Sequence, residues 1–163
     1  MRQLGLKQKK ITLLLLIVSS AFTSAPSLND VIPQFDKAVE NLKKDKVRVA
    51  VGNITYQKIG TDFSRYIAGE LSTQIARSAK FEEFSRDELD QILKEQKLAQ
   101  TDLFNQDTAA KVGNLKGLEA IITGEYVAAN VEVILTLKLL SIKTSKVIST
   151  AQIKIAKSDL PQG

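Results

Sequence analysis

The side chains of this chain that could do chemistry are carboxylates, because the sequence contains no histidine and no cysteine. This composition excludes thiolate nucleophiles, imidazole bases, haem ligation, disulfides and zinc sites built from cysteine and histidine. Acids cluster at 82–83 and 87–90, and paired carboxylates are the groups that glycosidases use. Acids in a first helical turn are, however, also stabilised by the helix dipole. We therefore predict that the acids support a helix and that no residue is catalytic.

A second candidate for chemistry is the segment from Gly52 to Gly60, which lies between an expected strand and an expected helix, as a phosphate-binding loop does. A Walker loop needs two glycines separated by four residues, then lysine and a hydroxyl residue. Here Gly60 is followed by Thr61, and Lys58 lies upstream. The motif is incomplete, so we expect an ordinary loop, with no nucleotide, metal ion or other cofactor.

The net charge of +5 is concentrated at the start of the chain. Four basic residues fall within the first ten positions, and no acidic residue precedes Asp30. Without those four, the 23 basic residues fall to 19, against 18 acidic ones. A nucleic-acid-binding surface needs a concentrated basic face. We therefore expect no nucleic-acid partner.

Residues 1–25 have the pattern of a secretory signal peptide, with a basic start, an apolar run over 11–18 and small residues after it. The run is shorter than the roughly twenty apolar residues that cross a bilayer as a helix, so cleavage is favoured over an uncleaved anchor. Cleavage after Ala21 is preferred to cleavage after Ala25, because a proline follows the second site. No cysteine follows the apolar run, so we expect no lipid anchor and at most a peripheral membrane contact.

The remaining chain predicts one domain of helices and strands. Residues 26–45 are expected to form an amphipathic helix that begins at Asn29 or Asp30 and packs on the domain, followed by the domain itself at 46–157 and a tail at 158–163. The helix has an apolar stripe of Ile32, Phe35, Val39 and Leu42. Further helices are expected from Thr61 or Asp62, from the capping-box pair Ser85 and Glu88, and from Asp107 to Gly113 or Gly117.

Five β-branched or alternating runs predict strands, at 47–51, 81–84, 120–127, 131–139 and 147–155. The last three follow each other through short turns at 128–130 and 143–146, which predicts an antiparallel meander. The fold class is therefore α/β (α+β), a two-layer mixed sheet covered by helices. Its expected order is helix, strand, helix, strand, two helices and three strands.

In their order and spacing, several segments resemble the cell-envelope domain family that includes the curli-secretion component CsgG, the flagellar outer-membrane protein FlgO and the penicillin-binding-protein activator LpoB. The FlgO-like branch fits best, because the chain ends in a plain meander with a short turn. The segments that carry the resemblance are 47–51 with 53–55, 81–86 with Leu89, Ile92, Leu93, Glu95 and Gln96, then 108–113, 117–124 and 137–144.

This resemblance implies a non-catalytic binding or assembly domain in the periplasm or at the outer membrane. Its partner would be another envelope protein or further copies of the same chain. CsgG-type channels also carry a lipid-modified cysteine and pore-forming hairpins, and LpoB-like activators carry a lipid anchor and a long tether, none of which we find here. The alternative is a periplasmic small-ligand-binding protein or a hydrolase that uses carboxylates.

Three polar positions shared with the family pattern are Arg86, Glu95 and Gln96. They either pair within the fold and tie a helix to the sheet, or contact a neighbouring subunit. The internal role is favoured, since polar contacts at helix ends are common without function. Exposed sheet edges also bind partners unless charged side chains protect them, and we expect Lys138, Lys146 and Lys154 to do so.

Overall fold

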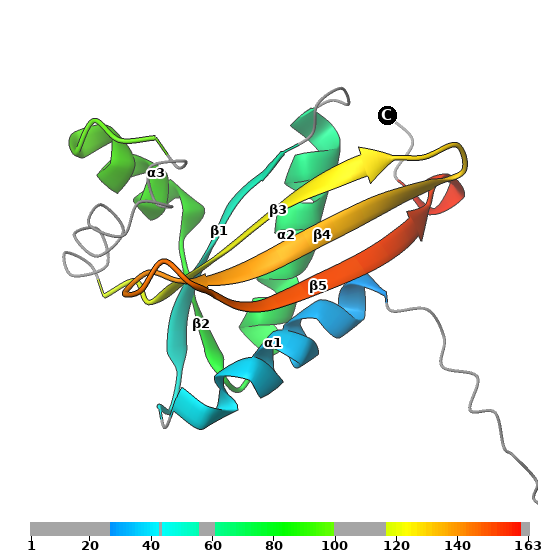
Figure 1. Cartoon of the computed structure of the whole chain (residues 1–163). Helices are drawn as coiled ribbons and strands as arrows, with labels where there is room; N and C mark the ends of the chain where they lie inside the picture. Colours follow the sequence, from blue (N-terminus) through cyan, green and yellow to red (C-terminus); the bar gives the residue numbers. More distant parts are fainter. Residues whose placement is uncertain (1–26, 43, 56–60, 100–116, 161–163) are drawn as a thin grey trace, which may run out of the picture.

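The computed structural model describes residues 27–42, 44–55, 61–99 and 117–160. These residues form a five-stranded sheet in the order β2-β1-β3-β4-β5, with helices packed against it (Figure 1). The strands are β1 (Val47–Thr55), β2 (Phe81–Phe84), β3 (Ala120–Ala128), β4 (Glu132–Ser141) and β5 (Val147–Ala156), and the helices are α1 (Val31–Val39), α2 (Thr61–Arg77) and α3 (Arg86–Glu95).

The sheet is mixed. β2, β1 and β3 run parallel, whereas β3, β4 and β5 form an antiparallel meander. The predicted α/β (α+β) fold, its helix cover and its closing meander are therefore confirmed. The short helix predicted from Asp107 lies outside the described residues.

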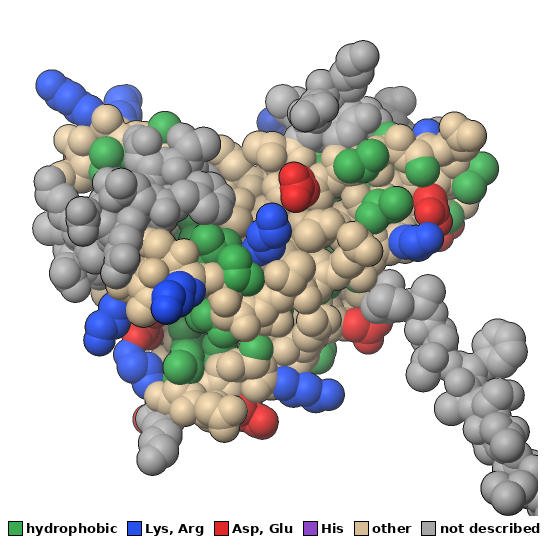
Figure 2. Space-filling view, viewed as in Figure 1, with side chains coloured by type: hydrophobic (Ala, Val, Ile, Leu, Met, Phe, Trp, Pro, Cys, Tyr) green, Lys and Arg blue, Asp and Glu red, His purple; other side chains and the backbone are tan. Residues whose placement is uncertain are grey.

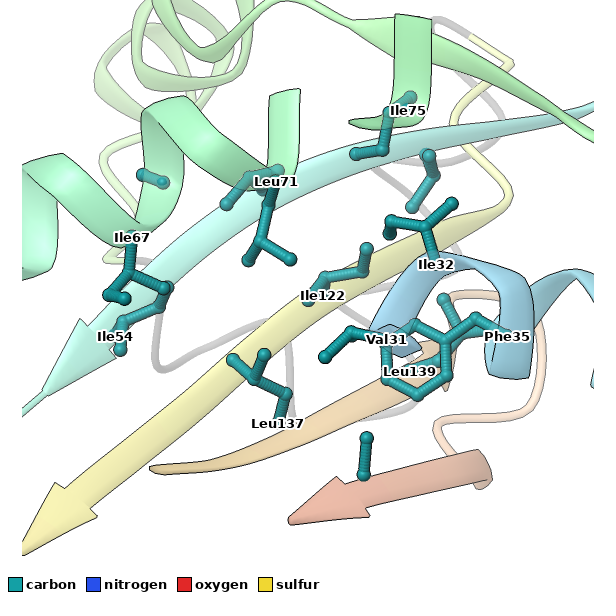
Figure 3. Packing of buried hydrophobic residues seen from close by; sticks show 14 of the residues in the cluster. Val31, Ile32, Phe35, Ile54, Ile67, Leu71, Ile75, Ile122, Leu137 and Leu139 are labelled. Carbon is teal, nitrogen blue, oxygen red and sulfur yellow. The ribbon is translucent and has the colours of Figure 1, made fainter. Parts of the chain in front are cut away.

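The main core lies between one face of the sheet and the helices α1 and α2 (Figure 3). Alternate residues of β4 point into it, because successive side chains of a strand face opposite sides. The helices contribute residues at a spacing of three or four, which places them on one stripe. Fully buried members of this core include Ile32, Phe35, Ile67, Leu71, Ile75, Ile122, Leu135, Leu137 and Leu139.

A smaller core lies on the opposite face, under α3. Leu89, Ile92 and Leu93 of this helix pack with Ala50, Phe84, Leu118, Ile121, Leu140 and Ile142. β1 and the start of β3 are thus buried on both faces. This double burial explains why their sequences read as nearly continuous apolar runs rather than as alternating ones.

The first helix is preceded by a turn that was not predicted. A 3-10 turn, Leu28–Asp30, precedes α1, and Ser27 donates to the Asp30 carboxylate from its backbone N–H at 2.7 Å and from its hydroxyl at 2.8 Å. These two bonds, the backbone one first, lower the pKa of Asp30. Asp30 is the N-cap residue of α1, one of the two predicted positions, although its side chain makes no capping hydrogen bond to that helix. Ser27 begins this helical segment.

Two local predictions are wrong. Leu42 is 49% exposed, because the α-helix ends at Val39 and a 3-10 turn, Glu40–Leu42, changes the period and turns Leu42 outward. Ser85 is the N-cap of α3, but its side chain makes no capping hydrogen bond. The predicted capping box with Glu88 is thus absent, although Asp87 and Glu88 do lie in the first turn, where the dipole favours acids.

None of the helices in the described ranges is both long enough and apolar enough to span a membrane.

Gly124 of β3 lies so close to β4 that there is no room for a side chain at this position. A Cβ atom added there would lie 2.5 Å from the carbonyl oxygen of Thr136 and 2.8 Å from a methyl carbon of Leu137. We expect Gly124→Ala to lower the free energy of unfolding by about 1–3 kcal/mol, the usual cost of overpacking, as measured by urea denaturation.

The matched control is Gly69→Ala in α2, where an added Cβ meets nothing within 4 Å. This change should raise the free energy of unfolding by about 0.5–1 kcal/mol, because alanine favours the helix. Equal effects of the two substitutions would contradict the close approach of β3 to β4.

Candidate functional site

Among the described residues, α3 alone packs on the second face of the sheet, and it covers the corner where β1 and β2 lie (Figure 1). The antiparallel half, β3 to β5, therefore presents on that side a surface that no described helix covers. We call it the open face and define it by the outward side chains of Thr123, Glu125, Val127, Glu132, Ile134, Thr136, Lys138, Thr150, Gln152 and Lys154.

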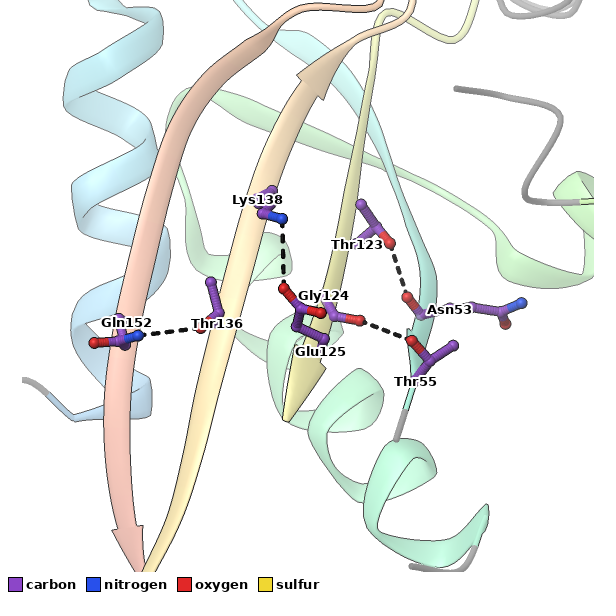
Figure 4. Close-up of polar contacts among 8 residues, drawn as sticks. All are labelled: Asn53, Thr55, Thr123, Gly124, Glu125, Thr136, Lys138 and Gln152. Atoms are coloured by element: carbon purple, nitrogen blue, oxygen red, sulfur yellow. Dashed lines mark hydrogen bonds and ion pairs between the residues drawn. The ribbon is translucent and has the colours of Figure 1, made fainter. Parts of the chain in front are cut away.

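Strand register arranges the middle of the open face in rows. Glu125, Thr136 and Gln152 lie side by side across β3, β4 and β5. Gln152 donates from Nε2 to Thr136 Oγ1 at 3.3 Å, as Figure 4 shows. The next row consists of Thr123, Lys138 and Thr150. Hydroxyl and amide groups therefore cover the centre of this surface.

The open face continues onto β1 through two further hydrogen bonds (Figure 4). The Thr123 hydroxyl donates to the backbone oxygen of Asn53 at 2.9 Å, and the Thr55 hydroxyl donates to the backbone oxygen of Gly124 at 3.5 Å. The register between β1 and β3 shifts in this region. The side chains thus bond backbone groups where the parallel ladder is irregular.

Two ion pairs cross the open face between neighbouring strands. Glu125 on β3 pairs with Lys138 on β4 at 3.5 Å, and Glu132 on β4 pairs with Lys154 on β5 at 3.2 Å. Each pair is partly exposed and contributes no net charge. Lys138 and Lys154 therefore lie on the face and pair with acids there, whereas Lys146 precedes β5 in the turn.

The open face becomes apolar near the β3–β4 turn (Figure 2). Val127 is 59% exposed and Val131, in the turn, is 76% exposed. Ile134, the partner of Val127 in register, is partly exposed. An open hollow adjoins this end, lined by Asn130, Val131, Glu132, Lys154, Ala156, Lys157, Ser158 and Asp159. Exposed apolar side chains grouped in this way mark contact surfaces more often than scattered ones do.

The outer edge of β5 is partly used by the chain itself. α1 packs beside β5 (Figure 4), and Gln34 of α1 donates from Nε2 to the backbone oxygen of Thr150 at 2.8 Å. Covering an edge with a helix is one way in which proteins prevent unwanted strand pairing. The side chains of the face are therefore more available to a partner than this part of the edge.

Comparison with known proteins agrees with this architecture. The sequence profile of the family described as "Curli production assembly/transport component CsgG" matches residues 34–156. The chain belongs to the CsgG family. No curated protein sequence matches this CsgG-family chain.

Solved structures share the fold of this CsgG-family domain at low sequence identity. The C-terminal domain of LpoB from Salmonella enterica matches with a TM-score of 0.65 and 14% identity, covering 80% of this chain and 96% of that one. The same domain from Escherichia coli gives 0.61 and 13%, covering 81% and 100%. A lipoprotein from Neisseria meningitidis gives 0.56 and 10%, covering 72% and 86%. At these identities the likeness establishes the fold alone.

The three polar positions predicted from the family pattern lie on α3, away from the open face. Arg86 donates from Nη2 to Oδ1 of Asn53 on β1 at 3.3 Å. Glu95 accepts a 2.9 Å bond from Gln91 one turn earlier on the same helix, and Gln96 is the C-cap residue. Arg86 thus links the helix to the sheet. A contact of these residues with a neighbouring subunit stays a prediction.

The acidic clusters do not converge on a site in the described residues. Glu82 lies 3.7 Å from the Nε atom of Arg48, and the other acids of the two clusters are exposed on β2 and α3. Across the described ranges, no charged or polar residue is buried, and no group of three or more acids is placed to hold a metal ion. Of the predicted loop, Gly52 to Thr55 belong to β1, and 56–60 lie outside the described residues.

The ion pairs of the open face should contribute little to stability, because partly exposed pairs are screened by water and lose side-chain entropy. We expect Glu132→Gln and Lys154→Gln each to change the free energy of unfolding by less than about 1 kcal/mol. Leu137→Ala, which truncates a fully buried neighbour on the same strand, should cost about 2–5 kcal/mol. Urea denaturation measures the free energy of unfolding of all three variants. A decrease of more than about 2 kcal/mol for either charge variant would contradict the expectation that the ion pairs of the open face add little to stability.

Proposed function

We propose that this CsgG-family chain is an exported, non-catalytic binding module of the bacterial cell envelope, and that its open face binds a protein partner. The observation that carries the proposal is the open face itself. The five-stranded sheet buries one face under α1 and α2, while half of its other face carries ordered side chains that no described helix covers. We place the chain in the FlgO-like branch, on its plain closing meander.

The side chains of the open face favour contact over reaction. They bond to one another and to backbone oxygens, and their charges are paired across strands. An enzyme or a small-ligand site would instead be expected to show buried polar groups that converge in a pocket. The hollow beside β5 is open to solvent, and no charged or polar residue in the described part of the chain is buried, so it does not favour the ligand-binding or hydrolase alternative.

The composition of the open face also indicates the kind of partner. Hydroxyls, amides and two neutral ion pairs lie beside a small apolar end formed by Val127, Val131 and Ile134. Protein interfaces likewise combine apolar surface with hydrogen-bonding groups. An anionic polymer would require unpaired lysines, whereas both lysines of the face are paired with acids.

A photo-crosslinking amino acid in place of Gln152 tests the face directly. We expect it to capture a protein in the envelope fraction, because Gln152 is exposed at the centre of the outer strand. The matched control is the same amino acid in place of Thr73, which is exposed on the outer side of α2. Capture at Thr73 with none at Gln152, read by mass spectrometry, would refute the proposed surface.

Export requires a separate test. Residues 1–25 should direct the chain to the periplasm or outer membrane and be removed, preferably after Ala21. Cell fractionation followed by mass spectrometry of the N-terminal peptide measures both. Recovery of the uncleaved chain in the cytosol would refute export and leave the binding face to be tested on its own.

A further inference from the structure

We propose that the open face binds a second copy of this chain around a twofold axis, forming a symmetric dimer. This inference rests on the proposed function, because it names the partner of the same surface. Three features support a second copy: the direction of the two ion pairs, the apolar side chains between them, and the covered edge of β5.

The two ion pairs point in the same direction across the sheet. Glu125 lies in register with Thr136, and its partner Lys138 is two residues further along β4. Glu132 lies on β4, and its partner Lys154 is in register with Ile134, again two residues further along. In both pairs, therefore, the line from acid to lysine crosses to the next strand along the same diagonal.

Because the two ion pairs point in the same direction, a second copy of the same surface can place its opposite charges against them. A twofold axis that lies in the plane of the face, perpendicular to the shared diagonal, reverses the direction of both pairs in the second copy. The acids of one copy are then displaced toward the lysines of the other. A twofold interface requires such self-complementarity, because the same patch forms both sides.

Between the rows of the two acids lies one row that carries two apolar side chains beside Lys154. Val127 and Ile134 are neighbours in register on β3 and β4, in a row between those of Glu125 and Glu132. Val127 is 59% exposed in the single chain. A dimer would remove this apolar row from water, and burial of apolar surface favours association.

Pairing through the edge of β5 is the other way in which two sheets could join. Here the Thr150 backbone oxygen already accepts a bond from Gln34, and α1 lies beside the strand. An added strand would have to displace this bond and the helix. Face-to-face contact requires no change in the described structure.

Charge reversal tests the second copy specifically. The mature full-length chain is studied by analytical ultracentrifugation over a range of concentrations, with circular dichroism to confirm folding. Lys138→Glu should weaken dimerisation by about tenfold or more, because like charges then face each other across the interface. The double variant Glu125→Lys with Lys138→Glu should return the dissociation constant to within about threefold of the original, because each copy again carries opposite charges.

Val127→Asp should abolish the dimer, whereas Leu42→Asp, at a comparably exposed position away from the face, should not.

An unmodified chain that stays monomeric to about 100 μM, far above typical specific affinities, overturns the dimer. In that case, capture of a different protein at Gln152 still supports the proposed function, and the absence of capture refutes both. If the double variant dimerises as weakly as Lys138→Glu, the symmetric contact is also overturned. In a twofold dimer both copies carry the reversed pair, so opposite charges should again face each other.

Discussion

The structure depends on the burial of one sheet face beneath α1 and α2. One valine and three leucines at alternate positions of β4 form one continuous core with Phe35 and the isoleucines of the two helices. Because side chains alternate along a strand, a shift of one residue in register would turn this apolar set outward and the threonines and charges inward. The same constraint that builds the core therefore also decides which side chains form the open face.

The parallel and antiparallel halves of the sheet differ in whether both of their faces are buried. β1 and the start of β3 pack against helices on both sides, and Arg86 further joins α3 to Asn53 on β1. β5 and most of β4 bury one side only, since Leu140 at the end of β4 also reaches the core under α3. Parallel strands are normally covered on both faces, whereas antiparallel strands can leave one face in water. The open face is thus a consequence of the change from parallel to antiparallel pairing at β3, which leaves a surface free for contacts without weakening the core.

Hydrophobic periodicity was sufficient to predict the strands, α2 and the closing meander, since these features follow from burial along a single segment. It was insufficient at helix ends. Leu42 continued an apolar stripe but followed a change to a 3-10 turn, and a second 3-10 turn, held by the bonds from Ser27 to Asp30, precedes α1. The open face was harder to predict, because the pairing of Glu125 with Lys138 depends on register between strands. No local pattern contains that information.

The placement of polar groups separates folding from binding in this domain. Side chains on the open face make partly exposed bonds and ion pairs, which contribute little to stability, while the opposite face supplies the apolar burial that stabilises the fold. Covering β5 with α1 and Gln34 limits unspecific pairing through backbone groups. The recognition that we propose for the open face then depends on side chains, whose charge and shape differ from one protein to another. A domain of this design can change its partner by substitution on the open face while α1, α2 and the sheet keep the same core.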